Sequence, residues 1–180
     1  MIHPVKHFIT ITRHRHKVIG YCFFVGIGFQ GLFHDLSKYS LVEFFNGARY
    51  YTGNCSPNAM ERIKRGYSLA WMHHKGRNKH HYEYWTDIIQ GEYQPVAMPI
   101  KYLKESLCDR IAASKIYMKK KYTNQSPLVY FESRMDAKFM HPDTAKVLHQ
   151  WLIWVSELGH RKALKKIKKI KSYREMEKYL

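Results

Sequence analysis

Residues 99–121 decide the fold most clearly; they read PIKYLKESLCDRIAASKIYMKKK. Pro99 suits the first helical position, because its φ is already helical and its missing N–H is not needed there. The apolar residues that follow recur at steps of three and four: Ile100, Leu103, Leu107, Ile111 and Met118. This spacing predicts an amphipathic helix from about residue 99 to about residue 121.

A similar pattern follows closer to the C-terminus. Pro142-Asp-Thr can begin a helix, and Gly159 can end it. The residues between them form one apolar stripe: Val147, Leu148, Trp151, Leu152, Val155 and Leu158. The sequence therefore predicts a second core helix over 142–159, followed by a basic helix over 161–180.

Helix-start signals also divide the N-terminal half. Ser40-Leu-Val-Glu43 has the form of a capping box and predicts a helix that ends near 53–54. Ser56-Pro57 predicts another that runs through Trp71 or somewhat beyond. We expect residues 76–98 to be less regular and residues 123–140 to form a loop with short elements.

The N-terminal region holds an ambiguous apolar run. Residues 5–33 suggest one or two helices, and residues 18–33 are nearly free of charge after a basic stretch, which imitates a signal peptide. The run is shorter than the roughly 20 residues that a membrane-spanning helix needs. It also contains Gln30 and four glycines, and no small-residue cleavage site follows it. A buried core helix is the favoured interpretation, with a membrane anchor or signal as the alternative.

Together these patterns predict an all-α, single-domain helical bundle. Its metal-binding part would span residues 1–160, with the basic helix over 161–180 as an appendage. The chain has 180 residues and is 45% hydrophobic, which is enough for one core. Its three cysteines lie far apart and include no CxxC, so a reducing, cytoplasmic setting fits best.

Charge and histidine content give the first indications of function. Lys and Arg number 31 against 14 Asp and Glu, a formal charge of +17, which favours polyanionic partners such as nucleotides, nucleic acid or an anionic membrane surface. The 12 histidines are bunched rather than spread, at 14/16, 34, 73/74 and 80/81. A lone histidine on an apolar helix is usually a hydrogen-bonded core residue. A combination with carboxylates on several helices instead suits a site for Zn, Mn or Fe.

The string His34-Asp-Leu-Ser-Lys38 concentrates this chemistry. His34 and Asp35 would sit at the end of one helix, with Lys38 one turn further on, where its ammonium could hold a substrate phosphate. Lys75 and Arg77 lie between the histidine pairs and are further candidates for phosphate binding, although a merely basic loop is an equal alternative. Asp35 and Lys38 are therefore the candidate catalytic residues.

The pattern resembles the HD superfamily of metal-dependent phosphohydrolases, including its binuclear members. The resemblance covers about residues 14–113: His14, the HDxxK string from His34 to Lys38, the HH pairs, and Asp109 in Cys-Asp-Arg-Ile-Ala-Ala. The chain also resembles uncharacterised bacterial and phage-type proteins that carry HDLSK and HHKGRNKHH strings. The resemblance implies a helical bundle that holds one or two divalent transition metal ions.

Carried over residue by residue, the resemblance implies that His14, His34, Asp35 and Asp109 bind one metal. One histidine from each HH pair would complete a second site, for which His74 and His81 are chosen. If residues 73–81 are helical, the pair His73 and His80 is equally well spaced. His16 would be solvated, and Glu105, four residues before Asp109, would have an outer or surface role.

The expected function is hydrolysis of a nucleotide or related phosphate ester or diester. Two alternatives remain open: a di-iron oxygenase of the HD type, and a basic helical protein that binds nucleic acid without catalysis. The partner would be a phosphate-containing small molecule or nucleotide, with nucleic acid possible and a membrane not expected. The sequence does not determine the oligomeric state.

Overall fold

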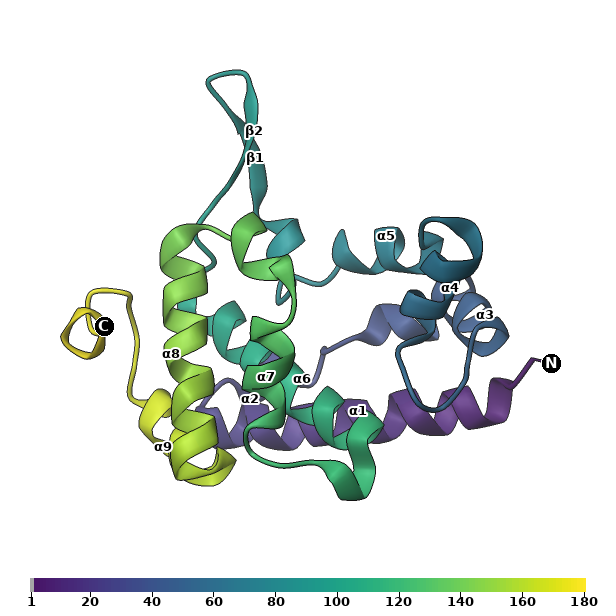
Figure 1. Ribbon diagram of the computed structural model, residues 1–180, viewed down its shortest axis with the longest axis horizontal. Coiled ribbons are helices and arrows are strands. Elements are labelled where there is room, and N and C mark those ends of the chain that lie inside the picture. Colours follow the sequence, from purple (N-terminus) through teal and green to yellow (C-terminus); the bar gives the residue numbers. More distant parts are fainter. Residues whose placement is uncertain (1) are drawn as a thin grey trace.

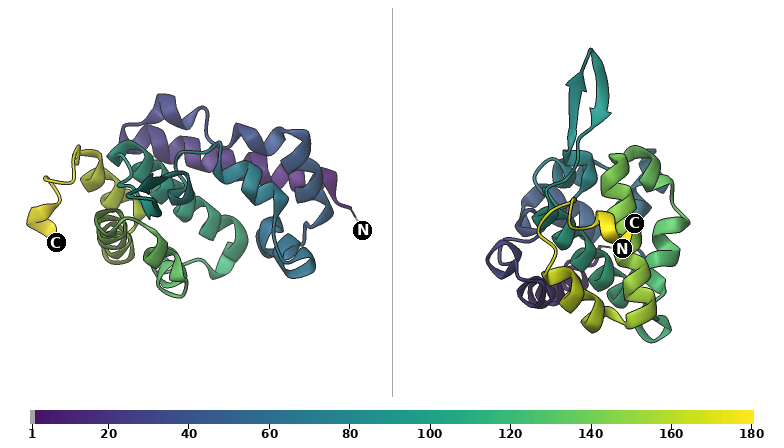
Figure 2. Two further views of the ribbon diagram at one scale, coloured as in Figure 1. Left: turned by 90° about the horizontal axis from the view of Figure 1, so that it is seen from above. Right: turned by 90° about the vertical axis from the view of Figure 1, so that its left-hand side faces the viewer.

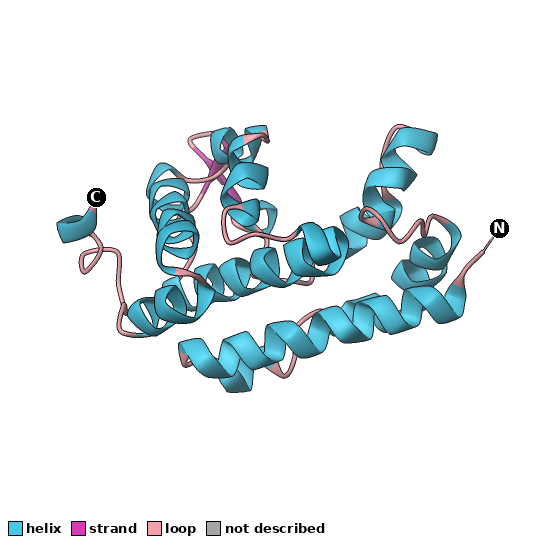
Figure 3. Cartoon of the chain, turned by 60° about the horizontal axis from the view of Figure 1, so that its bottom comes forward, coloured by secondary structure: helices cyan, strands magenta, loops and turns pink. Residues whose placement is uncertain are grey.

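The computed structural model describes residues 2–180, apart from the side chain of Met135, and most of it is helical (Figure 3). The α-helices are α1 (Pro4–Val25), α2 (Gly28–Gly31), α3 (Leu41–Arg49), α4 (Pro57–Arg65), α5 (Leu69–Lys75), α6 (Ile100–Met118), α7 (Ser126–Glu132), α8 (Pro142–Leu158) and α9 (His160–Lys168). Short 3-10 turns are η1 (Leu36–Tyr39), η2 (Tyr82–Tyr84), η3 (Lys119–Lys121), η4 (Met135–Phe139) and η5 (Glu177–Tyr179). The mainly α fold that the sequence predicts is confirmed.

Helices α1 and α6 pack against each other, and together they carry both the core and the candidate site (Figure 1). The buried residues of α1 recur at steps of three and four along one face: His7, Ile11, His14, Val18, Cys22 and Val25. The first three lie beside a polar cavity, whereas Val18, Cys22 and Val25 join the apolar core. One continuous helix face thus connects the two regions.

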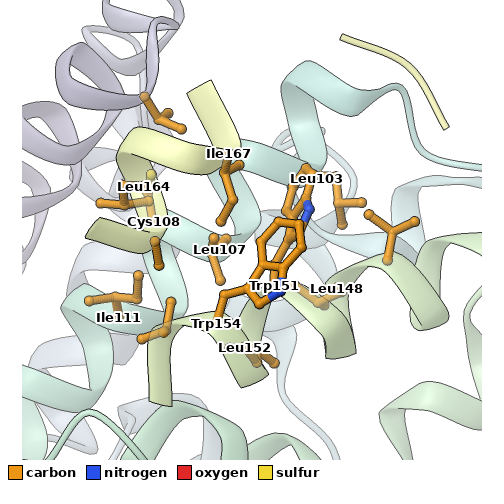
Figure 4. Close-up of a cluster of buried hydrophobic side chains, with 14 of the residues drawn as sticks. Leu103, Leu107, Cys108, Ile111, Leu148, Trp151, Leu152, Trp154, Leu164 and Ile167 are labelled. Carbon is orange, nitrogen blue, oxygen red and sulfur yellow. The ribbon is translucent and has the colours of Figure 1, made fainter. Parts of the chain in front are cut away.

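The hydrophobic core lies mainly between α6, α8 and α9 (Figure 4). Leu103, Leu107 and Ile111 of α6 are fully buried against Trp151 and Leu152 of α8. From α9, Leu164 and Ile167 enter the same core, which explains the apolar stripe of an otherwise basic helix. The inward residues of α6 and α8 are those that the sequence predicts, except that Met118 and Leu158 at the helix ends are exposed.

The basic C-terminal helix is shorter than the sequence predicts. Helix α9 ends at Lys168, and the chain then turns back beside α8 (Figure 1). Met176 in this last segment is fully buried, and the indole N–H of Trp151 contacts its sulfur at 3.2 Å. The tertiary contact of Met176 outweighs helix continuation through the lysine-rich run.

The expected single helix after Ser56 is divided in two. Helix α4 ends at Gly66, whose φ of 81° closes the helix in the left-handed conformation. Ser68 then caps α5 by accepting a hydrogen bond from the backbone N–H of Trp71 at 3.0 Å. Because the chain turns here, the histidines of α5 face α3 rather than continuing the line of α4.

A β-hairpin was not predicted and corrects the all-α expectation. Strands β1 (Thr86–Ile89) and β2 (Glu92–Pro95) pair antiparallel and project from the helical body (Figures 1 and 2). Between them, Gln90 and Gly91 both have positive φ, at 54° and 83°, as a type I′ hairpin turn requires. The string Asp87-Ile-Ile-Gln does not alternate apolar and polar residues, so the sequence carries no clear strand signal here.

The nearly uncharged run at 18–33 forms the end of α1 and all of α2, and only part of it is buried. Gly31 permits α2 to approach α1 closely, since a Cβ there would lie 2.4 Å from Cβ of Cys22. Phe29 and Phe33 are exposed, so the expectation of a buried core helix is correct only for the face that carries Val18 and Cys22. Within residues 2–180, helices combining the length and apolarity needed to cross a bilayer do not occur.

Candidate metal centre

The first group of potential ligands joins α1, the turn after α2, and α6. Nε2 of His14 lies 2.8 Å from Oδ1 of Asp109, and Nε2 of His34 lies 3.2 Å from Oδ2 of Asp35. The two pairs are adjacent, because His34 Nε2 is 3.8 Å from Asp109 Oδ1 and His14 Nε2 is 3.9 Å from Asp35 Oδ2. These are the four residues that the sequence grouped as one metal site.

A second group meets the other oxygen of the same aspartate. Oδ1 of Asp35 lies 3.3 Å from Nε2 of His74 and 3.5 Å from Nε2 of His80. Nε2 of His81 is 2.9 Å from Nε2 of His74. In each group the potential ligand atoms all lie within 4.8 Å of one another. Asp35 therefore stands between two sets of imidazoles and presents one oxygen to each.

The backbone around Asp35 is specialised for this position. Asp35 has φ 53° and ψ 27°, a left-handed conformation that aspartate tolerates better than most residues. The side chain of Arg15 fastens the turn to α1, since it donates to the carbonyl oxygens of Leu32 and His34. The turn that carries the His-Asp pair is thereby fixed to the helix that carries His14.

Glu105 orients two of the imidazoles from behind. Its Oε1 accepts a hydrogen bond from Nδ1 of His34 at 2.9 Å, and Nδ1 of His80 lies 3.2 Å from the same oxygen. In a neutral imidazole, donation from Nδ1 to a carboxylate leaves Nε2 as the atom with a free lone pair, directed at the centre. Gln30 donates to the other oxygen of Glu105 and helps to hold it in place.

Glu43 has the same relation to the second group. Nδ1 of His74 donates to Oε2 of Glu43 at 2.8 Å, and Nδ1 of His73 donates to Oε1 at 2.6 Å. Ser40 caps α3 as expected, with its Oγ 3.4 Å from the backbone N–H of Glu43. The Glu43 carboxylate reaches the histidines instead of completing the capping box, because the buried His74 and the half-buried His73 are the stronger partners.

Several converging atoms make no hydrogen bond within residues 2–180. They are Nε2 of His14, His34 and His80, together with both carboxylate oxygens of Asp35. Within these residues, the charge of the buried Asp35 carboxylate is compensated by Lys38, whose Nζ lies 2.5 Å from Oδ2, and by the surrounding imidazoles. Buried polar atoms without partners are costly, so this set fits a cation with nitrogen and oxygen ligands, such as Zn, Mn or Fe.

The pKa shifts differ from one group of the centre to the next. Burial alone would lower the pKa of His34, but Asp35, Glu105 and Asp109 raise it to about 10. Burial would raise the pKa of the Asp35 carboxyl, yet His34, Lys38 and His74 hold it well below its usual range. Burial lowers the pKa of His81, as do His80 and His74, which keeps its imidazole neutral.

The centre opens into a cavity of about 620 Å³. Lys38, Asp109 and the imidazoles of His14, His74 and His81 line its wall, whereas Asp35, His34 and His80 lie behind them. Three arginines also line the cavity: Arg62, Arg110 and Arg134. Arg110 and Arg134 both face Asp136, whereas Arg62 makes no ion pair with a carboxylate in residues 2–180.

Most residues singled out in the sequence do meet in space, with some exceptions. Lys75 and Arg77 do not line the cavity; Arg77 is exposed and donates to the backbone carbonyl of His73. His16 is exposed, as expected. His80 was not among the predicted ligands, because only one histidine of each HH pair was assigned to the site. Both members can converge because the second pair lies in a turn, not on a helix.

Sequence reasoning also undervalued Glu105 and Glu43. Glu105 is buried, and its position one helical turn before Asp109 was the available signal. Glu43 is buried as well and was assigned only to a helix cap. Neither contact can be predicted from local sequence, because Glu105 lies 71 residues from His34 and Glu43 lies 31 residues from His74.

A helical body with a carboxylate shared between two groups of histidines defines a candidate binuclear metalloprotein. The chain belongs to a family of unknown function, DUF5662, which it matches over residues 3–153. The match includes every residue of the candidate centre and leaves α9 and the C-terminal segment outside. No curated protein matches the chain, and neither does any solved structure.

Proposed function

We propose that this protein is a metal-dependent phosphohydrolase that acts on a nucleotide or a related phosphate ester or diester. The observation that carries the proposal is Asp35, whose two oxygens face two separate groups of imidazole nitrogens. His14, His34 and Asp109 would complete one ion site around Oδ2, and His74, His80 and His81 the other around Oδ1. The resemblance to the HD superfamily implies the same first site, and a second site with one histidine from each HH pair.

Bound divalent ions would lower the pKa of water toward neutrality and offset the charge that develops on a phosphoryl group. The protein's own contribution begins with Glu105 and Glu43, which hold His34, His80 and His74 in the orientation that directs Nε2 inward. Lys38 lies at the cavity wall beside Asp35, and its pKa is raised by Asp35 and Asp109 despite burial. Its ammonium is therefore a permanent donor for a phosphoryl oxygen.

The cavity suits a nucleotide-sized substrate. Its volume lies within the range of about 300–1,000 Å³ that is usual for small-molecule sites. Arg62 lies over the ring of Trp71, 5.3 Å from its centroid, which leaves the guanidinium edge free for an anion. A second phosphate or a sugar–phosphate oxygen could bind there while the reacting phosphate lies beside Lys38.

The direct test combines metal content with turnover. The protein is stripped with a chelator, reloaded separately with Mn²⁺, Fe²⁺ or Zn²⁺, and assayed on nucleoside phosphates, cyclic nucleotides and bis-p-nitrophenyl phosphate. We expect metal binding and metal-dependent release of phosphate or of the ester alcohol. Stoichiometric metal without hydrolysis of any of these esters would contradict the phosphohydrolase assignment but not the metal centre.

Lys38 separates substrate contact from metal binding. Lys38→Ala should retain its metal but lower kcat by about 100-fold, because it removes a charge-assisted contact to the phosphoryl group. Arg62→Gln should mainly raise KM, and the exposed Arg77→Gln is the matched control with wild-type kinetics. Unchanged kinetics in Lys38→Ala would exclude this role, and a larger effect at Arg77 than at Arg62 would mean that substrate approaches from outside the cavity.

A carboxylate between two histidine groups also favours a second candidate, a di-iron oxygenase. Iron is suited to imidazole and carboxylate ligands, and two adjacent sites would allow it to react with oxygen. The discriminating measurement is optical and Mössbauer spectroscopy of protein loaded with iron under anaerobic conditions and then exposed to air. Oxygen uptake coupled to oxidation of an added organic substrate would favour the oxygenase, and ester hydrolysis without oxygen uptake the phosphohydrolase.

A further inference from the structure

A second cavity, of about 460 Å³, lies away from the metal centre and shares no lining residue with the first. One wall is α9 and the other is the segment that turns back after it. Five lysines line it, with a single carboxylate, and the full lining is Lys162, Lys165, Lys166, Lys169, Ile170, Glu175, Lys178 and Tyr179. We call this feature the basic groove.

The positive charge of the basic groove is concentrated and not neutralised. Lys162, Lys165, Lys166 and Lys169 lie at i, i+3, i+4 and i+7 on α9 and its end, so their side chains share one helix face. None of the five lysines forms an ion pair with a carboxylate within residues 2–180. The carboxylate of Glu175 accepts a hydrogen bond from the backbone N–H of Lys171 at 2.8 Å. Like charges at these spacings repel each other, and a bound polyanion would relieve the repulsion.

The groove is held in shape by the core beneath it. Ala163, Leu164 and Ile167 anchor the inner face of α9, and Met176 anchors the returning segment. The rings of Trp154 and Tyr179 meet edge to face at 5.1 Å. Nζ of Lys166 lies 3.6 Å from the centroid of the Trp154 ring and 4.7 Å from that of Tyr179. This cation–π contact fixes one ammonium group before any ligand binds.

We propose that the basic groove binds the backbone of single-stranded nucleic acid. A walled, concave groove suits a chain-like polyanion, whereas a membrane surface contacts convex faces. Lysines spaced along one helix match successive phosphates, and Tyr179, with 39% of its surface exposed, offers a ring on which a base can stack. The groove would thus hold a strand at a site separate from the metal centre.

The test is fluorescence anisotropy with a short labelled oligouridylate and the full-length protein, over a range of salt concentrations. In the groove variant, Lys162, Lys165 and Lys169 are each replaced by Gln. The matched control replaces Lys119, Lys120 and Lys121 of η3, three exposed lysines, in the same way. We expect the groove variant to bind at least tenfold more weakly and its salt slope to fall by roughly 2, since each lost phosphate contact contributes about 0.7 on single strands.

Three further outcomes decide the proposal. The affinity of the control variant for oligouridylate should stay within about twofold of wild type. Equal losses of affinity in both variants would overturn the proposal, because they would show that binding depends only on total charge. Tyr179→Leu should weaken binding roughly fivefold or more without changing the salt slope. Vesicles of phosphatidylcholine and phosphatidylserine form the last arm. If the groove lysines govern vesicle binding and leave oligouridylate binding unchanged, the nucleic-acid proposal is overturned.

Discussion

The two inward faces of α6 are chemically opposite. On one face Leu103, Leu107 and Ile111 are fully covered by apolar side chains of α8 and α9. On the other, Glu105 and Asp109 meet histidines from three other segments of the chain. A single helix therefore separates an apolar core, which needs no ligand, from a polar cluster whose central atoms make no hydrogen bond to any of the described residues, 2–180.

The two faces of α6 contribute differently to the free energy of folding. Apolar burial stabilises the folded state by about 25 cal/mol per Å², without any geometric demand on a ligand. Buried imidazoles and carboxylates cost free energy unless every lone pair is matched. A cation bound by the seven potential ligands of this face would therefore add to the stability of the folded protein.

The largest expected effect is loss of metal from the polar face. Asp35→Ala and His34→Ala should each weaken metal binding by more than about 100-fold, because each removes a ligand, while most of the helical signal in circular dichroism is retained. His16→Ala, which changes an exposed histidine on α1, is the control. Metal analysis after dialysis measures the effect. Full occupancy in either ligand variant would remove the basis for the centre.

A substitution on the apolar face should lower stability without changing metal affinity. Leu107→Ala should lower the free energy of unfolding by about 2–5 kcal/mol, since it leaves a cavity beside α8 and α9. Metal affinity of the folded fraction should stay near that of wild type. Leu41→Ala, at a side chain that is 74% exposed, should change stability by less than about 0.5 kcal/mol. Urea unfolding tests both. A Leu107 variant that folds normally yet loses metal would break the separation of the two faces.

Glu105 lies on the polar face, but we propose that it orients the histidine ligands and does not itself bind metal. Glu105→Gln should weaken metal binding about 10- to 100-fold, as expected when a carboxylate behind a histidine ligand is lost. Asp109→Asn should cause the larger loss, and Glu157→Gln, at an exposed acid of α8, should cause none. Calorimetric titration with Zn²⁺ or Mn²⁺ ranks the three. A greater loss at Glu105 than at Asp109 would make Glu105 the ligand.

The smallest effect is a pH dependence of stability, and it comes from a lysine that is buried beside the end of α9. Lys104 is 3% exposed and donates to the carbonyl of Lys168, and burial, together with Lys171, lowers its pKa from 10.5 to about 8. Between these two pH values the unfolded chain binds more protons than the folded one. Stability should therefore rise, by about 1 kcal/mol or more, as the pH increases from 8 to 10.5.

Lys104→Met provides the control for this pH dependence. It removes the titrating group while keeping the side-chain volume, so the rise in stability between pH 8 and 10.5 should disappear. Denaturant unfolding at a series of pH values gives the difference between wild type and variant directly. A wild-type slope equal to that of the variant would show that Lys104 is not desolvated in the folded protein.

The sequence alone determined the helices with a strong repeat. Residues 99–121 and 142–159 combine apolar steps of three and four with a proline at the start, and both helices occur nearly as predicted. Through the resemblance to the HD superfamily, it also grouped His14, His34, Asp35 and Asp109. The fold brings these four residues together. Local spacing suffices for a helix, because the interactions that form it span only four residues.

The rest of the centre depends on contacts between segments that are far apart in the chain. Glu43 and Glu105 reach their histidines across 31 and 71 residues, and no local pattern records such distances. The convergence of His80 and His81 depends on a turn rather than a helical period, and the basic groove depends on the return of Met176 to Trp151. Each of these contacts is set by which surfaces must be buried together, and that is a property of the whole chain rather than of any segment.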